Sequence, residues 1–232
     1  MFDYSKKIFA RVVFVCLFFV CLLMGMPSAA SAASADKLVK DAVDTLKEMS
    51  QEDDAGSLAD TIRDAKAIAF VPSMIKAGFG IGGEYGEGFI LLKKDGKWYG
   101  PSFYNMSGAS IGIQIGVQKT AFVLVVNNQA GVDAFLHSRT KLGADVAVAA
   151  GPVGRRGDAA TDGKMKASIY SYSMSKGLFA GVSLDGAVLT ISDKHNKEYW
   201  KKDISAEDAL KRQATDERVT PLIKELGKLK SK

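Results

Sequence analysis

The segment GFGIGGEYGEGFILLKKDGKWYG, residues 78–100, contains signals for two different folds. Its first half places Gly78, Gly80 and Gly83 at the G-x-G-x-x-G spacing of dinucleotide-binding loops. Its second half carries Asp95-Gly96 between two β-prone runs, and this dipeptide is a strong hairpin signal because both residues tolerate positive φ. A dinucleotide loop leads from a strand into a helix, whereas this segment leads into a hairpin. The sequence therefore predicts paired strands here and no nucleotide cofactor.

Glycines recur at even positions along the same segment, and a strand places alternate residues on one face. Such a face leaves room for another backbone to approach closely, or for the sheet to bend sharply. The even-numbered positions are Gly78, Gly80, Gly82, Gly86 and Gly88. We therefore interpret these glycines as structural.

Helices are predicted on the N-terminal side of this segment. Between Ala35 and Gln51, apolar residues recur at spacings of three and four, as in an amphipathic helix. Ser57 is a suitable N-cap for a second helix that runs to about Lys66. The apolar run AIAFVP that follows is expected to stop at Pro72.

Strands dominate the rest of the chain. Alternation predicts a strand over Ala109–Gln118, and the run TAFVLVVNN predicts another that is buried on both faces. Asn128 is a candidate cap for a helix from Gln129 to about Ser138, and a second Asp-Gly turn is expected at Asp185-Gly186. Further strands are expected in ADVAVAAG and ASIYSYSM, and a final amphipathic helix in ERVTPLIKELGKLKSK. The pattern predicts an α+β fold: a Gly-rich, strongly twisted antiparallel or barrel-like sheet with flanking amphipathic helices.

The first 32 residues have the pattern of a secretory signal peptide. Basic residues precede the apolar run VVFVCLFFVCLLMGM, and Ala30-Ser31-Ala32 fits a signal-peptidase site. Cleavage is expected after Ala32 or, alternatively, after Ala35. A periplasmic or secreted protein follows from this interpretation. An N-terminal membrane anchor is the alternative, although the apolar run is shorter than the roughly 20 residues that a span needs.

Length and composition are those of an ordinary folded protein, with 47% hydrophobic and 25% charged residues in 232. Removing the signal takes three basic residues and one acidic residue from totals of 31 and 26, which leaves a net charge near +3. That charge is too small to indicate a nucleic-acid partner. The expected division is a signal peptide at 1–32, N-terminal helices at 33–63, a β-rich domain at 64–196 and a C-terminal helical extension at 197–232.

Catalytic and metal-binding residues are scarce in the sequence. Cys16 and Cys21 both lie in the predicted signal peptide, and His137 and His195 are the two histidines, so zinc has no ligand set. No serine-nucleophile motif and no EF-hand spacing occur. The sequence therefore predicts a protein that is not an enzyme and that holds no metal or other cofactor. An unrecognised hydrolase would need carboxylates that converge only in the fold.

Basic positions suggest a binding role. Arg155 and Arg156 lie in a glycine-flanked loop, and guanidinium groups and loop amides suit phosphate. Lys76 and Lys176 each stand beside apolar strands. The alternative for all four is solubilising surface charge. The terminal amphipathic helices either lie in a headgroup region or pack on the core.

Four longer segments resemble, in order, the characteristic segments of the SYLF domain family, in its bacterial secreted branch. The resemblance covers roughly Asp64 to Asn196. The segments are AKAIAFVPSMIKAGFGIGGEYGEG, GPSFYNMSGASIGIQIGVQ, KLGADVAVAAGPVGR and SYSMSKGLFAGVSLDGAVL.

This resemblance implies a non-catalytic module that binds anionic phospholipid at a membrane surface. Eukaryotic relatives bind phosphoinositides, and fungal ones also bind and bundle actin filaments; a secreted protein would not meet cellular actin, so actin binding is not carried over. Position in the matching segments points to Lys76, Arg155 and Lys176 as lipid-binding residues, with Arg156 as a neighbour. The competing hypothesis is an envelope scaffold whose helices, in particular Val219 to Leu229, dock on a protein partner.

Overall fold

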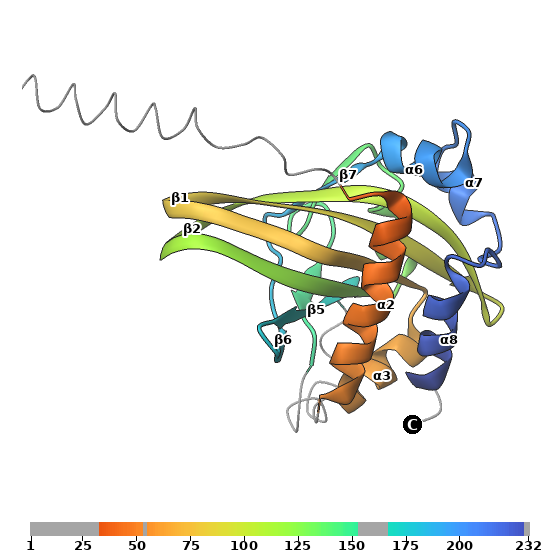
Figure 1. Ribbon diagram of the computed structural model, residues 1–232, viewed down its shortest axis with the longest axis horizontal. Helices are drawn as coiled ribbons and strands as arrows, with labels where there is room; N and C mark the ends of the chain where they lie inside the picture. Colours follow the sequence, from red (N-terminus) through yellow and green to blue (C-terminus); the bar gives the residue numbers. More distant parts are fainter. Residues whose placement is uncertain (1–32, 53–54, 153–166, 230–232) are drawn as a thin grey trace, which may run out of the picture. The chain divides into compact units, whose positions relative to one another are not determined.

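One long hairpin forms the centre of the molecule (Figure 1). The computed structural model describes residues 33–52, 55–152 and 167–229, with the backbone alone at 55, 79–81 and 110–116. Strand β1, Ala67–Lys94, pairs antiparallel with β2, Lys97–Val126. Asp95 and Gly96 join them with φ of 50° and 74°, which confirms the predicted turn. Strands of 28 and 30 residues are several times the usual length.

The hairpin curls back on itself. Three register shifts interrupt the pairing, between Val71 and Met74, between Gly78 and Gly80 and between Ile90 and Leu92. Shifts of this kind are β-bulges, which bend and twist a strand. The Tyr104 hydroxyl donates to the Phe70 carbonyl oxygen at 3.4 Å, so the first residues of β1 lie beside the part of β2 that contains Tyr104. The ribbon thereby becomes a half-barrel.

Gly88 lies at the closest approach within this curl. A Cβ atom built at Gly88 would lie 2.2 Å from the Phe70 carbonyl oxygen and 3.0 Å from the Tyr104 ring. Only a residue without a side chain fits there, which confirms the structural interpretation of this glycine. The segment after Gly78 continues as a strand and leads into no helix. Pro72 does not end the strand, as the sequence had suggested, because the bulge between Val71 and Met74 accommodates it.

Five shorter strands complete the sheet on the free edge of β2. The order is β3-β7-β2-β5-β4, with β1 also on β2 and β6 on β5. Every pair is antiparallel except β4 with β5. The bounds are Arg139–Lys141 for β3, Val148–Ala150 for β4, Ile169–Ser175 for β5, Leu178–Gly181 for β6 and Val188–Ile191 for β7. The predicted α+β class with a curled, mainly antiparallel sheet is confirmed.

Helices pack on this sheet. The described helices are α2 at Ala35–Gln51, α3 at Ala55–Asp64, α4 at Gln129–Asp133, α6 at Asp193–Trp200, α7 at Ala206–Leu210 and α8 at Thr220–Leu229. Ser57 lies inside α3 and donates to the Pro152 carbonyl, so it is not the predicted N-cap. Asn128 does cap α4, accepting from Gly131 N, but that helix ends at Asp133, earlier than predicted.

The apolar faces of the terminal helices are buried in the core. Leu38, Val39 and Leu46 of α2 are at most 2% exposed, and so are Leu222 and Leu226 of α8. In Figure 1 the two helices stand side by side against the sheet, and they contact each other. Neither apolar face is therefore available to a bilayer or to a partner, which corrects both uses proposed for these helices. None of the helices in the described residues combines the length and hydropathy of a bilayer span.

Two hydrophobic cores lie on opposite faces of β2. Val123 and Val125 belong to the core that includes α2, α3 and α8, whereas Leu124 and Val126 belong to the core that includes α4. All four side chains are fully buried, so the predicted burial of this strand on both faces is confirmed. Residues 33–232 form one compact unit that holds both cores.

Arg218 connects three parts of the helical layer. Its guanidinium donates to Asp216 at 2.6 Å, to Asp36 of α2 at 2.9 Å and to the Tyr199 carbonyl at 3.3 Å. The same group stacks on the Tyr199 ring, with Cζ 3.8 Å from the ring centroid. Hydrogen bonding to Arg218 lowers the pKa of Asp216. Arg218 therefore fixes the turn before α8 against α2 and α6.

Substituting Gly88→Ala tests the close approach in the curl. The new methyl group would overlap the Phe70 carbonyl, so we expect the free energy of unfolding to fall by about 2 kcal/mol or more. Gly83→Ala is the matched control, because a Cβ there lies 4.0 Å from its nearest neighbour. Urea unfolding of both variants measures the difference. Equal stability of the two would contradict the close approach.

Replacing Arg218→Gln tests the helical junction through its pH dependence. The pKa of Asp216 is lowered in the folded chain, so this pair stabilises the fold above the ordinary Asp pKa of about 4 and loses that effect as pH falls through the lowered value. We expect the variant to unfold at a lower temperature than the parent at pH 7, and the gap to narrow near pH 3. Calorimetry at both pH values measures this difference in unfolding temperature between the variant and the parent. A gap of the same size at both would exclude an Asp216 contribution.

Candidate functional site

Exposed apolar side chains gather on the middle part of the β1–β2 hairpin, which forms one end of the folded ribbon in Figure 1. Among the described residues, the large hydrophobic side chains that are exposed are Ile75 at 43%, Tyr85 at 49%, Val117 at 76% and Leu178 at 74%. The first three lie on β1 and β2, and Leu178 begins the neighbouring β6. In Figure 1 this end of the ribbon extends beyond α2. Clustered exposed apolar groups of this kind indicate a contact surface.

Three lysines stand among these apolar residues. Lys76 pairs in register with Gln118, and the adjacent residues Ile75 and Lys119 pair with each other. The Gln118 Nε2 donates to Ser175 Oγ at 3.1 Å, and Ser175 precedes Lys176 in the β5–β6 turn. Two of the predicted site residues, Lys76 and Lys176, are thereby brought to the same end of the sheet, and Lys119 joins them.

We call this set the ribbon-end patch. It consists of Ile75, Lys76, Val117, Lys119, Lys176 and Leu178. No ion pair joins its three lysines to any residue in the described part of the chain. Sequence reasoning missed Lys119 and the three apolar members, because their grouping depends on strand register.

An open groove of about 420 Å³ separates this patch from α2. Lys119 and Lys176 line its sheet side, and Asp41, Asp44 and Glu48 line its helix side. The helix neutralises part of its own acidity, because Asp41 pairs with Lys37 and Asp44 with Lys47. The lysines of the sheet side remain available to an anion.

The other predicted site residues, Arg155 and Arg156, lie outside the described residues. Beyond the patch, partial burial and the neighbouring Glu87 carboxylate raise the pKa of Tyr85 on the same ribbon. His137 is exposed after α4, whereas His195 is 1% exposed and hydrogen-bonded through both ring nitrogens.

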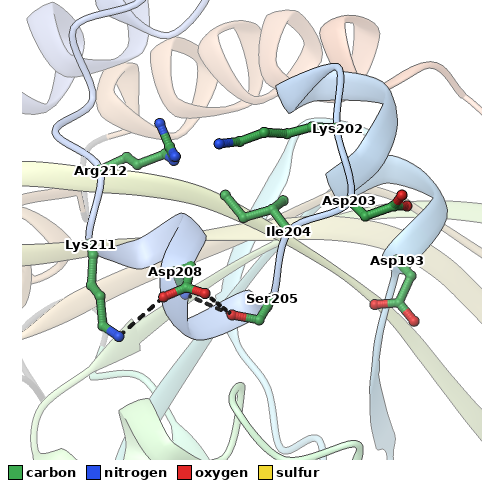
Figure 2. A pocket seen from close by; sticks show the side chains of 8 residues that line it. All are labelled: Asp193, Lys202, Asp203, Ile204, Ser205, Asp208, Lys211 and Arg212. Atoms are coloured by element: carbon green, nitrogen blue, oxygen red, sulfur yellow. Dashed lines mark hydrogen bonds and ion pairs between the residues drawn. The ribbon is translucent and has the colours of Figure 1, made fainter.

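A wider groove of about 790 Å³ lies beside α7 (Figure 2). In Figure 2 the amine of Lys202 and the guanidinium of Arg212 point toward each other on one side, while Asp193 and Asp203 lie on the other. Asp208 accepts from Ser205 and pairs with Lys211, and these hydrogen bonds lower its pKa. The Ser205 hydroxyl is occupied in capping α7, so the groove presents balanced charges and no activated nucleophile.

Known metal and hydrolase arrangements do not match the described residues. No group of three or more His, Cys, Asp or Glu side chains in those ranges is placed to hold a metal ion. Ser192 and His195 are hydrogen-bonded at 2.8 Å, but both are at most 5% exposed and neither lines one of the grooves described above. The ribbon-end patch is therefore the better candidate site.

A family model described as "Ysc84: Las17-binding protein actin regulator" matches residues 107–229, just over half of the chain. This chain belongs to the Ysc84 family. The match confirms the resemblance to SYLF domains, another name for the same family, while the bacterial secreted branch stays a prediction. It also reaches α8, beyond the stretch on which the resemblance was recognised.

Two members of the Ysc84 family illustrate the similarity. The Saccharomyces cerevisiae protein named LAS seventeen-binding protein 3 is 38% identical over 151 residues, which cover 63% of this chain and 33% of the yeast protein. The Homo sapiens protein named SH3 domain-containing YSC84-like protein 1 is 36% identical over 154 residues, which cover 66% of this chain and 45% of the human protein. The chain thus spans a third to under a half of these relatives, which are named as binding proteins or by domain content and not as enzymes.

Proposed function

We propose that this chain is a non-catalytic module that binds anionic phospholipid headgroups at a membrane surface through the ribbon-end patch. The observation that carries the proposal is the grouping, at one end of the sheet, of exposed apolar side chains with lysines that lack an ion-pair partner among the described residues. Apolar side chains lower their free energy when they enter the boundary between headgroups and acyl chains, while lysine ammonium groups stay at the phosphates.

Strand geometry supports this use of the patch. Ile75, Val117 and Lys119 belong to one face of the ribbon, and Lys76 belongs to the other, because alternate residues point to opposite faces. A ribbon that approaches a membrane end-on can therefore place lysines on both sides of its apolar tip. Each lysine near an anionic surface contributes about 1 kcal/mol. Arg155 and Arg156 remain part of the proposal as a second contact.

The proposed setting is the periplasm or the exterior of the cell, after removal of residues 1–32. Export would put the module opposite an anionic membrane surface without access to cellular actin. An N-terminal membrane anchor is the alternative, and it would hold the patch near the same surface.

Liposome flotation tests the proposal with the mature protein, Ala33 to Lys232, and vesicles that are neutral or contain anionic phospholipid. The decisive variant combines Lys76→Ala, Lys119→Ala and Lys176→Ala. At about 1 kcal/mol per lysine, we expect affinity for anionic vesicles to fall by roughly a hundredfold. The matched control removes three exposed lysines that lie outside the patch, Lys94, Lys97 and Lys141, and we expect it to bind nearly as the parent does.

A second variant separates insertion from charge. The double variant Val117→Ser, Leu178→Ser keeps every lysine, so its electrostatic attraction to anionic vesicles stays the same. We expect it to bind more weakly than the parent at low and at high salt alike. If the lysine variant floats as well as the parent while Arg155→Ala with Arg156→Ala does not, the contact belongs to the arginine loop. If the patch and control variants lose the same affinity for anionic vesicles, net charge alone explains the binding and the patch is not the contact site.

A protein partner is the second candidate, and the names of the relatives favour it. LAS seventeen-binding protein 3 is named for a protein partner, and the Ysc84 family model is described in the same terms. Since the apolar face of α8 is buried, a partner would have to dock elsewhere, for example on the ribbon-end patch. This function would be favoured if the protein floats with none of the vesicles and a protein partner crosslinks at Val117 or Leu178.

A further inference from the structure

Ala33, the first described residue, is fixed on both sides of its backbone. Its nitrogen donates to Glu87 Oε2 at 3.0 Å, and its carbonyl oxygen accepts from His195 Nε2 at 2.8 Å. The next residue, Ser34, caps α2 by accepting from the Lys37 nitrogen. The contacts to Glu87 and His195 join residues 54 and 162 positions apart in sequence, so the start of the compact unit is tied to its centre.

His195 is held for this contact by its own surroundings. The side chain is 1% exposed, and its Nδ1 lies 2.8 Å from Ser192 Oγ. A carbonyl oxygen can only accept, so Nε2 carries the proton that is donated to Ala33.

Glu87 has a nearly buried carboxylate, and His195 Nε2 lies 4.0 Å from its Oε2. Its side chain is 11% exposed, Oε1 accepts from the Tyr85 hydroxyl at 3.3 Å, and Oε2 accepts from Ala33. Among the described residues, no Lys or Arg side chain pairs with it. Removing a carboxylate from water is costly unless an opposite charge compensates it.

A permanent positive charge beside Glu87 can come from the chain itself. Ala30-Ser31-Ala32 is the predicted signal-peptidase site, and cleavage after Ala32 turns the nitrogen of Ala33 into an α-ammonium group. That nitrogen is the atom that lies 3.0 Å from the Glu87 carboxylate. We propose that Glu87 and His195 form a binding site for the new N-terminus at Ala33, so that removal of the signal peptide completes an ion pair inside the fold.

This site distinguishes between the two possible cleavage positions. Cleavage after Ala35 would remove Ala33 together with both of its contacts. It would also remove Ser34, the N-cap of α2, and Ala35, which is 0% exposed. Cleavage after Ala32 keeps all of these and adds a charge-assisted hydrogen bond, which is stronger than the neutral amide bond of the uncut chain. The mature N-terminus is therefore Ala33.

Two measurements test the inference. First, the full chain is expressed in a secreting bacterial host, and mass spectrometry of the exported protein is expected to give Ala33 as the first residue. An N-terminus at Asp36, or retention of residues 1–32, would overturn the proposal.

Second, thermal unfolding compares the protein that begins at Ala33 with one that begins five residues earlier, at Ser28. The longer protein keeps Ala33 as an amide, so we expect its Tm to be lower by roughly 3 °C. In the Glu87→Gln background this difference should vanish, whereas Glu84→Gln, on the same strand but against Gly108, should leave it intact. Equal Tm values for the two lengths, or an undiminished difference in E87Q, would overturn the proposal. The comparison of lengths needs no substitution, so it holds even if E87Q fails to fold.

Discussion

The backbone pairing of β1 with β2 sets the position of nearly every other element. It runs from the turn at Asp95-Gly96 to the pair of Ala67 with Val126. Along its other edge, β2 pairs with β7 at Tyr104–Ser107 and with β5 at Ala121–Val126. Because the hairpin curls between these two places, the strands that join β2 far apart in sequence both contribute to the core that includes α4, through Leu189 of β7 and Ile169 of β5. The helices then cover the face that the curl leaves open.

The stretch of β2 between its two outer partners explains why the candidate site lies where it does. Among the described residues, positions 108–120 pair with β1 alone, so no third strand covers this part of the ribbon. Water therefore reaches side chains on both faces, Ile75 and Val117 on one and the partly exposed Lys76 on the other. The shorter strands thus leave the middle of the ribbon uncovered, and Lys76 and Lys119 of the ribbon-end patch lie on it.

Local signals in the sequence predicted the fold well, and the two errors made on the hairpin have a common cause. Asp95-Gly96 and the need for glycine at Gly88 depend on neighbouring backbone, and both were correctly predicted. The site depends on register. Counting back from the turn without bulges sets Lys76 opposite Ile115, whereas the bulges move it opposite Gln118, beside Lys119. Bulges leave no short sequence pattern, so Lys119 was missed, and Pro72 was taken for a strand end.

The placement of β2 between two cores has a consequence for how the molecule unfolds. Val123 and Val125 serve one core, while Leu124 and Val126 serve the other, so neither interior can open without displacing the same backbone. Local unfolding of one core therefore disrupts the other, and the two cores unfold in one cooperative transition. A hairpin that begins with neighbouring residues at its turn also offers folding a local starting point, from which pairing extends progressively to contacts distant in sequence.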